Sequence, residues 1–174
     1  NRLTLSYPHI RNQVEQGLAE NIRKYYPDCE VVAGTSTAGI AHAALVADIL
    51  GLPMCYVRSS AKDHGRQNQI EGKMEPGTKV VVIEDLISTG GSVIEVVNVL
   101  REVGAEVLGI ASIFTYGLQK GIERMQEAQV KNVSLSNYDA LVEVAVEQDY
   151  IKAEDVKKLQ AFQKNPSDSG WMDL

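Results

Sequence analysis

The sequence is poor in the features that mark secreted, membrane-bound and nucleic-acid-binding proteins. It has only two cysteines, Cys29 and Cys55, in apolar segments and without metal-ligand spacing, so buried free thiols in a reducing cytoplasm are expected. The longest apolar runs, such as Val80–Ile83, are too short to span a membrane, and no signal peptide opens the chain. The net charge of −6 argues against a nucleic-acid partner, because phosphate backbones need a basic face. We therefore expect a cytoplasmic protein that binds neither a membrane nor nucleic acid.

The remaining composition is that of an ordinary globular domain. Hydrophobic residues make up 44% of the chain and charged residues 23%. A chain of 174 residues is long enough to bury most of the apolar surface of one domain. We therefore expect a single domain over residues 1–174, with a frayed tail at residues 165–174. The opening Asn1-Arg2-Leu3-Thr4 lacks an initiator Met, so we expect that an N-terminal piece is missing.

Segments with strand-like and helical patterns alternate along the chain. Strands are predicted at Val31–Ala33, Met54–Val57, Lys79–Glu84, Val107–Phe114 and Asn132–Leu135. Helices are predicted at Pro8–Tyr25, Ile40–Leu50, Val93–Val103, Leu118–Ala128, Tyr138–Gln148 and Ala153–Phe162. Nearly continuous apolar strands between helices indicate an α/β fold, a mostly parallel sheet with helices on both faces. Ligands of such sheets lie beyond the carboxyl ends of the strands, which selects three loops: Gly34–Gly39, Arg58–Gly77 and Asp85–Ser92.

The loop Asp85–Ser92 combines acids, hydroxyls and glycines. Two adjacent carboxylates, Glu84 and Asp85, precede a Ser/Thr/Gly turn that opens a helix. Glycines let the backbone approach a ligand, and the N–H groups of a first helical turn favour an anion. The carboxylates would repel a phosphate, so they should face ribose hydroxyls or a hard cation. This combination fits a sugar phosphate; the alternative is a capped helix beside a solvated acid pair.

The other two loops are less specific. The second concentrates three fixed cations and a histidine: Arg58, Lys62, Arg66 and His64. A basic loop beside an acidic pair is able to close over a polyphosphate, although its composition fits a solvated charged loop equally well. The loop Gly34–Gly39 has exposed amides and, by itself, fits an ordinary strand-to-helix turn as well as a pyrophosphate site.

Longer strings of residues carry a family resemblance. Val80-Val81-Val82-Ile83-Glu84-Asp85-Leu86-Ile87-Ser88-Thr89-Gly90-Gly91-Ser92 resembles the phosphoribosyl pyrophosphate (PRPP) motif of the type I phosphoribosyltransferases. Arg58-Ser59-Ser60-Ala61-Lys62-Asp63-His64-Gly65 resembles the flexible catalytic loop of orotate phosphoribosyltransferases, and Gly34–Gly39 resembles the family's pyrophosphate loop. The resemblance covers essentially the whole chain, including Phe114-Thr115-Tyr116 and Leu135-Ser136-Asn137-Tyr138.

This resemblance implies a Mg²⁺-dependent pentosyltransferase that attaches the ribose phosphate of PRPP to orotate in pyrimidine synthesis. The products are orotidine 5′-monophosphate and pyrophosphate. The implied PRPP-binding residues are Arg58, Lys62, His64, Glu84, Asp85, Leu86, Ile87, Ser88, Thr89, Gly90, Gly91 and Ser92. Lys62, His64 and Asp85 are the implied catalytic residues, and Ser88 is the implied orotate contact. No residue is expected to hold Mg²⁺ alone, because PRPP bridges it. A cytoplasmic homodimer with shared active sites is also implied.

Several positions depart from the family pattern, and other functions stay open. Thr37-Ala38 stand where other members carry Tyr-Lys, Ser59 replaces a second loop lysine, and Tyr116 stands near the position of an orotate-binding Arg. The family's N-terminal hood, which helps to hold orotate, would precede Asn1. The alternatives are a regulator that senses PRPP, a phosphoribosyltransferase for another base, and a serine hydrolase. The hydrolase would use Ser36, His64 and Asp85.

Overall fold

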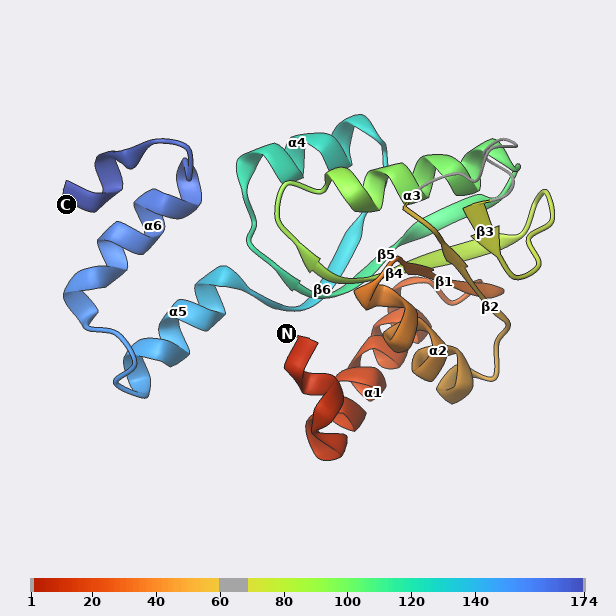
Figure 1. Cartoon of the computed structure of the whole chain (residues 1–174), viewed down its shortest axis with the longest axis horizontal. Coiled ribbons are helices and arrows are strands. Elements are labelled where there is room, and N and C mark those ends of the chain that lie inside the picture. The colour runs from red at the N-terminus through yellow and green to blue at the C-terminus, as the bar shows by residue number, and fades with distance from the viewer. Residues whose placement is uncertain (1, 60–68, 174) are drawn as a thin grey trace.

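The computed structural model describes residues 2–59 and 69–173. Within them, one sheet has the strand order β3-β2-β1-β4-β5-β6 (Figure 1). Its strands are β1 (Val31–Thr35), β2 (Met54–Val57), β3 (Ile70–Glu71), β4 (Lys79–Ile87), β5 (Glu106–Thr115) and β6 (Asn132–Asn137). Neighbouring strands are parallel, except that β3 runs antiparallel to β2. The sheet is therefore mostly parallel, as predicted.

Helices cover both faces of this sheet. The helices in residues 2–59 and 69–173 are η1 (Arg2–Ser6), α1 (Pro8–Tyr25), α2 (Ala38–Leu50), α3 (Gly91–Glu102), α4 (Gln119–Glu127), α5 (Tyr138–Glu147), η3 (Ala153–Asp155), α6 (Val156–Lys164) and η4 (Ser169–Asp173). Helices α1 and α2 lie on one face, and α3 and α4 lie on the other (Figure 1). Helices α5 and α6 extend away from the β6 side of the sheet (Figure 1).

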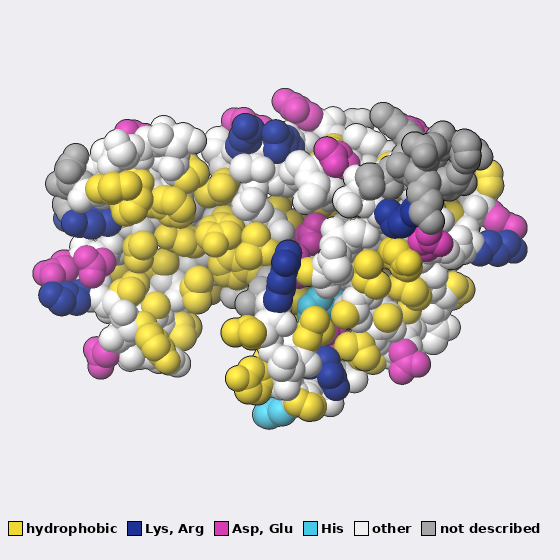
Figure 2. Space-filling view, in the orientation of Figure 1, with side chains coloured by type: hydrophobic (Ala, Val, Ile, Leu, Met, Phe, Trp, Pro, Cys, Tyr) yellow, Lys and Arg dark blue, Asp and Glu magenta, His cyan; other side chains and the backbone are white. Residues whose placement is uncertain are grey.

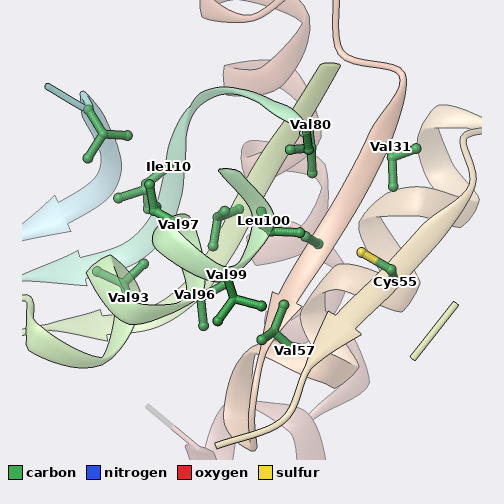
Figure 3. Packing of buried hydrophobic residues seen from close by; sticks show 14 of the residues in the cluster. Val31, Cys55, Val57, Val80, Val93, Val96, Val97, Val99, Leu100 and Ile110 are labelled. Atoms are coloured by element: carbon green, nitrogen blue, oxygen red, sulfur yellow. The ribbon is translucent and has the colours of Figure 1, made fainter. Parts of the chain in front are cut away.

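The central strand β4 contributes to two hydrophobic clusters, one on each face. Val80 and Val82 belong to the cluster under α3, and Val81 and Ile83 belong to the cluster under α1 and α2. Successive strand residues point to opposite faces, so an unbroken apolar run is what a strand covered on both sides requires. Figure 3 shows the α3 side chains that cover the first cluster, at helical spacing: Val93, Val96, Val97 and Leu100.

Two strands continue further toward the candidate site than the sequence predicts. Strand β4 ends at Ile87 rather than Glu84, because its pairing with β5 continues to the Ile87–Thr115 partners. Asp85 therefore lies in the strand and not in the following turn. Strand β1 includes Thr35, and α2 begins at Ala38, so the first loop shrinks to two residues.

Three smaller predictions need correction in part. The polar stretch after Arg58 contains the short strand β3, which the sequence did not reveal because two residues carry no periodicity. The tail is not frayed throughout: η4 places Trp171 against Phe162, with ring centroids 5.5 Å apart. Cys29 is only half-buried and precedes β1, whereas Cys55 is buried in β2; both thiols are free.

The connections between strands reverse direction between β1 and β4. The chain passes from β1 to β2 on one side of the sheet and from β4 to β5 on the other. The carboxyl ends of β1 and β4 therefore flank the switch point at which open α/β sheets bind ligands. Separately, none of the helices in residues 2–59 and 69–173 has the length and apolar character needed to cross a membrane.

Candidate active site at the carboxyl ends of β1 and β4

A hydrogen-bonded cluster joins the ends of β1 and β4. Thr35 Oγ1 lies 2.8 Å from Glu84 Oε1 and 3.2 Å from the carbonyl oxygen of Ile83. The backbone N–H of Asp85 donates to the same Glu84 oxygen over 2.9 Å. The carboxylate of Glu84 is thus held by both strands. The sequence had indicated only exposed backbone amides in the first loop, so the side-chain contact of Thr35 is new.

The surroundings of Glu84 change its acidity. Glu84 is buried, with only 5% of its surface exposed to solvent. Burial raises the pKa of Glu84 to about 7, and the neighbouring Asp85 adds to the rise. The hydrogen bond from Thr35 acts in the opposite direction and lowers this pKa. A carboxyl group that titrates near neutral pH at a sheet's switch point is a candidate for a functional group.

The second acid, Asp85, lies close to the start of the chain. Its side chain is 12% exposed, and its Oδ2 lies 3.8 Å from Nε of Arg2, whose side chain is 77% exposed. Helix η1 therefore brings a basic residue to the edge of the site. No pattern in the sequence pointed to Arg2, because the contact depends on how η1 packs against α1.

The predicted turn after β4 links the strand to α3. Leu86 is half-buried and Ile87 buried, and both complete the strand. Ser88 and Thr89 are half-buried, and Gly90 adopts the left-handed φ of 74° before α3 begins. The next two predicted residues, Gly91 and Ser92, form the start of α3, where backbone N–H groups have no partner within the helix. The turn thus gathers hydroxyl and amide donors beside the two acids.

Helix α4 packs against this turn from the outside. A Cβ atom added to Gly121 would lie 2.6 Å from the carbonyl oxygen of Ser88, so only glycine permits this approach. From the next helical turn, Arg124 Nη1 donates to the carbonyl oxygen of Thr89 over 3.0 Å and to its hydroxyl oxygen over 3.2 Å. The sequence predicted this helix but not its contact with the turn.

Arg58, the predicted residue of the second loop that the structure describes, lies next to the β2–β3 pair. The backbone N–H of Arg58 donates to the carbonyl oxygen of Gln69 over 2.9 Å, and its Nε lies 3.4 Å from Glu71 Oε1. Two other predicted residues, Lys62 and His64, lie outside the described residues.

A cavity of about 60 Å³ brings parts of the three predicted loops together. Its lining includes Thr35 and Ser36 from the first loop, Arg58 from the second, and Ser92 from the third. Ser36 Oγ donates to the carbonyl oxygen of Val57 over 2.7 Å. This bond engages the hydroxyl hydrogen with backbone, which disfavours Ser36 as the nucleophile of a hydrolase.

A larger hollow of about 870 Å³ opens on the other side of the turn. Its lining includes Ser88 at the end of β4 and Thr115 at the end of β5, and it continues between α4 and the β6 edge. Tyr116 follows directly, and its ring contacts the rings of Phe114 and Tyr138 with centroids 5.3 and 5.7 Å apart. Two spaces of different size therefore border the turn, the smaller one at Ser92 and the larger one at Ser88.

Comparison with known proteins identifies the family of the chain. Residues 8–149 match the phosphoribosyl transferase domain family. The chain is 60% identical, over 172 residues, to a protein of Bacillus cereus (strain G9842) named orotate phosphoribosyltransferase. The alignment covers 99% of this chain and 82% of that relative. A relative of the same name from Bacillus anthracis is also 60% identical over 172 residues.

Solved structures give the same result. The orotate phosphoribosyltransferase of Aeropyrum pernix has a TM-score of 0.75 and 27% identity, covering 86% of this chain and 82% of its own. The UMP synthase of Leishmania donovani has a TM-score of 0.80 over 93% of this chain and 34% of its own; at 24% identity it bears on the fold alone. The chain belongs to the phosphoribosyl transferase family and, within it, to the orotate phosphoribosyltransferases.

Proposed function

We propose that this chain transfers the 5-phosphoribosyl group of PRPP to orotate. The products are orotidine 5′-monophosphate and pyrophosphate, and the reaction belongs to the de novo synthesis of UMP. The observation that carries this proposal is the 60% identity, over 99% of the chain, to the orotate phosphoribosyltransferase of Bacillus cereus. Two buried carboxylates beside a donor-rich turn, at the switch point of the sheet, support it chemically.

The two acids and the turn bind different parts of PRPP. Glu84 and Asp85 accept hydrogen bonds from the ribose hydroxyls, because carboxylate oxygens have no donor to offer a phosphate. The turn Ser88–Ser92 binds the 5′-phosphate through its hydroxyls and through the free N–H groups at the start of α3. Leu86 and Ile87 complete the motif as the end of the strand that holds both parts in place.

The departing pyrophosphate is assigned to the basic residues of the second loop. Arg58, Lys62 and His64 neutralise the charge that grows on this group as its bond to the ribose breaks. The cavity that Arg58 shares with Ser36 and Ser92 supports this placement, since it lies between the phosphate turn and the first loop. Lys62 and His64 act mainly in the transition state, so they affect turnover more than PRPP affinity.

The acid pair also fits the Mg²⁺ ion on which the family depends. Carboxylate oxygens suit this hard cation, which favours one or two protein carboxylates together with substrate oxygens and water. In residues 2–59 and 69–173, no group of three or more His, Cys, Asp or Glu side chains is arranged to hold a metal ion. Glu84 and Asp85 would hold Mg²⁺ together with oxygens of bound PRPP. The bound ion would neutralise charge on the pyrophosphate.

The reaction replaces one bond to C1 of the ribose by another. The C1–O bond breaks with its electron pair leaving on pyrophosphate, the ring gains oxocarbenium character, and a ring nitrogen of orotate forms the new bond after losing its proton. Placement and charge stabilisation dominate, since no protein nucleophile is needed. Ser88 contacts orotate, which is consistent with its position as the first residue of the phosphate turn and as part of the lining of the larger hollow.

The working form is proposed to be a cytoplasmic homodimer in which the basic loop of one subunit reaches the site of the other. Exposed hydrophobic side chains support an interface between subunits. Figure 2 shows hydrophobic side chains gathered over the C-terminal helices on the displayed face. Large exposed hydrophobic side chains in the N-terminal segment are Leu3, Tyr7 and Ile10. Those in the C-terminal segments are Leu141, Val144, Tyr150 and Met172.

The proposal is tested by measuring pyrophosphate release from PRPP in the presence of Mg²⁺. Orotate is compared with adenine, hypoxanthine and uracil as the acceptor base. We expect release with orotate and little with the other bases. Faster release with another base would assign a different substrate. Tight PRPP binding without release for any base would indicate a regulator. Labelling of Ser36 by a fluorophosphonate would indicate a hydrolase.

A further inference from the structure

Arg124 lies against the turn to which the proposed function assigns the 5′-phosphate. Its Nη1 donates to the carbonyl oxygen of Thr89 over 3.0 Å and to the Thr89 hydroxyl oxygen over 3.2 Å. A Cβ atom added to Gly91, the first residue of α3, would lie 3.1 Å from the same nitrogen. The guanidinium group therefore contacts both the turn and the start of the helix that follows it.

Close packing of α4 holds Arg124 in this position. Gly121, one helical turn earlier, approaches Ser88 so closely that an added Cβ atom would lie 2.6 Å from its carbonyl oxygen. Met125 packs from the same side, with its Cε 3.1 Å from the Cβ position of Gly90. Residues three and four apart share one face of a helix. The face of α4 that carries Arg124 is thus the face that contacts the turn.

The charge of Arg124 is not neutralised by a neighbouring acid. Among the described residues, no carboxylate lies within ion-pair distance of its guanidinium group, and only Nη1 has a protein acceptor. Two other arginines near the site do have a carboxylate close to their guanidinium group. Arg2 lies near Asp85, and Arg58 lies near Glu71. The turn itself contains no basic residue. Arg124 is therefore well placed to offset the repulsion between the acids of β4 and a phosphate.

We infer that Arg124 is a positioning residue for the 5′-phosphate of the substrate, an inference that rests on the proposed function. It fixes the carbonyl group and the hydroxyl oxygen of Thr89, which leaves the hydroxyl hydrogen free to donate to a phosphate oxygen. Its positive charge attracts the phosphate dianion to the turn. Ligands that carry this phosphate depend on Arg124, and ligands that lack it do not.

Calorimetry with two fragments of the substrate separates this role from general support of the fold. Ribose 5-phosphate and pyrophosphate are each titrated, with Mg²⁺, into the wild type, Arg124→Gln and Arg124→Lys. Arg101→Gln is the matched control, since Arg101 also ties a helix to a neighbouring backbone: its Nη1 donates to the carbonyl oxygen of Ala128 over 2.7 Å. Arg101 lies near the end of α3 remote from the turn.

Arg124→Gln should bind ribose 5-phosphate about tenfold more weakly, as expected when a partly exposed charge near a phosphate is lost. Its affinity for pyrophosphate should stay unchanged. Arg124→Lys should recover most of the loss, and Arg101→Gln should match the wild type. Affinity of the wild type for ribose 5-phosphate should also fall more steeply with added KCl than that of Arg124→Gln.

Other outcomes have distinct meanings. Unchanged ribose 5-phosphate affinity in Arg124→Gln, or an equal loss for both fragments, would overturn the inference while the proposed function stands. A wild type that binds pyrophosphate but not ribose 5-phosphate would overturn the assigned phosphate turn and the role of Arg124 with it. If Arg124→Gln does not unfold cooperatively, failure of Arg124→Lys to bind better than an uncharged Arg124→Met variant would also overturn the inference.

Discussion

The hydroxyl of Thr35 lies 2.8 Å from the carboxylate of Glu84, and this contact connects the first loop of the site to its acidic pair. It joins β1 to β4 at the switch point of the sheet. The contact also sets an electrostatic balance, since burial raises the pKa of Glu84 while the Thr35 hydrogen bond lowers it. Binding at Glu84 should therefore depend on pH, with Thr35 adjusting the midpoint.

PRPP affinity should increase as the pH rises through about 7. Burial raises the pKa of Glu84 to about 7, so the unliganded protein carries this group protonated below that pH. The ionised form is the better acceptor for ribose hydroxyls, so binding releases a proton. Calorimetry at pH 7 in buffers of different ionisation enthalpy measures this release. Glu84→Gln should abolish it, and Thr35→Val should move the midpoint to higher pH. A proton uptake on binding would contradict the assignment.

Asp85→Asn should weaken PRPP binding by about tenfold or more, because the amide puts a donor where ribose hydroxyls need an acceptor. Titration calorimetry with Mg²⁺ present measures the change. Asp48→Asn is the control, since Asp48 is exposed on α2. Equal affinity in Asp85→Asn and the wild type would remove Asp85 from the site.

Gly39→Ala should destabilise the protein and disturb the first loop. A Cβ atom at Gly39 would lie 2.6 Å from the carbonyl oxygen of Ile83 and would overlap Thr35 Oγ1. Overpacking of this kind costs about 1–3 kcal/mol of unfolding free energy, which urea denaturation measures. Gly170→Ala is the control, because the atom nearest to its new Cβ, Asp168 Oδ1, is 3.4 Å away. A Gly39→Ala protein as stable as Gly170→Ala would contradict the close approach of α2 to the strand ends.

Two inactive variants should restore activity when they are mixed, if the basic loop acts across a dimer interface. Lys62→Ala disables the loop, and Asp85→Asn disables the acid pair. Random exchange of equal amounts makes about half of the dimers mixed, and each mixed dimer has one intact site, so about a quarter of all sites recover. Steady-state turnover measures the recovery, and a tag-based pull-down first establishes that mixed dimers form. Mixed dimers without activity would show that each loop serves its own subunit.

The sequence predicts local features of this fold well, because their causes are local. Helix α1 has the predicted bounds Pro8–Tyr25: a proline suits a first helical turn, and apolar residues recur along one face. Helix α3 is likewise followed by Gly104 with the left-handed φ of 86°. The PRPP motif was found because its residues are consecutive. The motif could therefore be recognised without knowing which strands are neighbours in the sheet.

Contacts between distant segments were not predictable in the same way. Strand β4 continues through polar Asp85 because β5 pairs with it as far as Thr115, and this register is a property of the sheet. Thr35 meets Glu84 only because β1 and β4 are neighbours. Arg124 reaches Thr89 only because Gly121 lets α4 approach the turn. Each of these contacts depends on the topology rather than on local sequence spacing.

The most direct test is to identify both products of the reaction and to remove the acid pair. The wild type, with PRPP, Mg²⁺ and orotate, should form orotidine 5′-monophosphate and pyrophosphate in equal amounts, as measured by mass spectrometry and a coupled pyrophosphate assay. A Glu84→Gln/Asp85→Asn variant that still unfolds cooperatively should lose both products together. Pyrophosphate release without the nucleotide, or full activity in the double variant, would contradict the account.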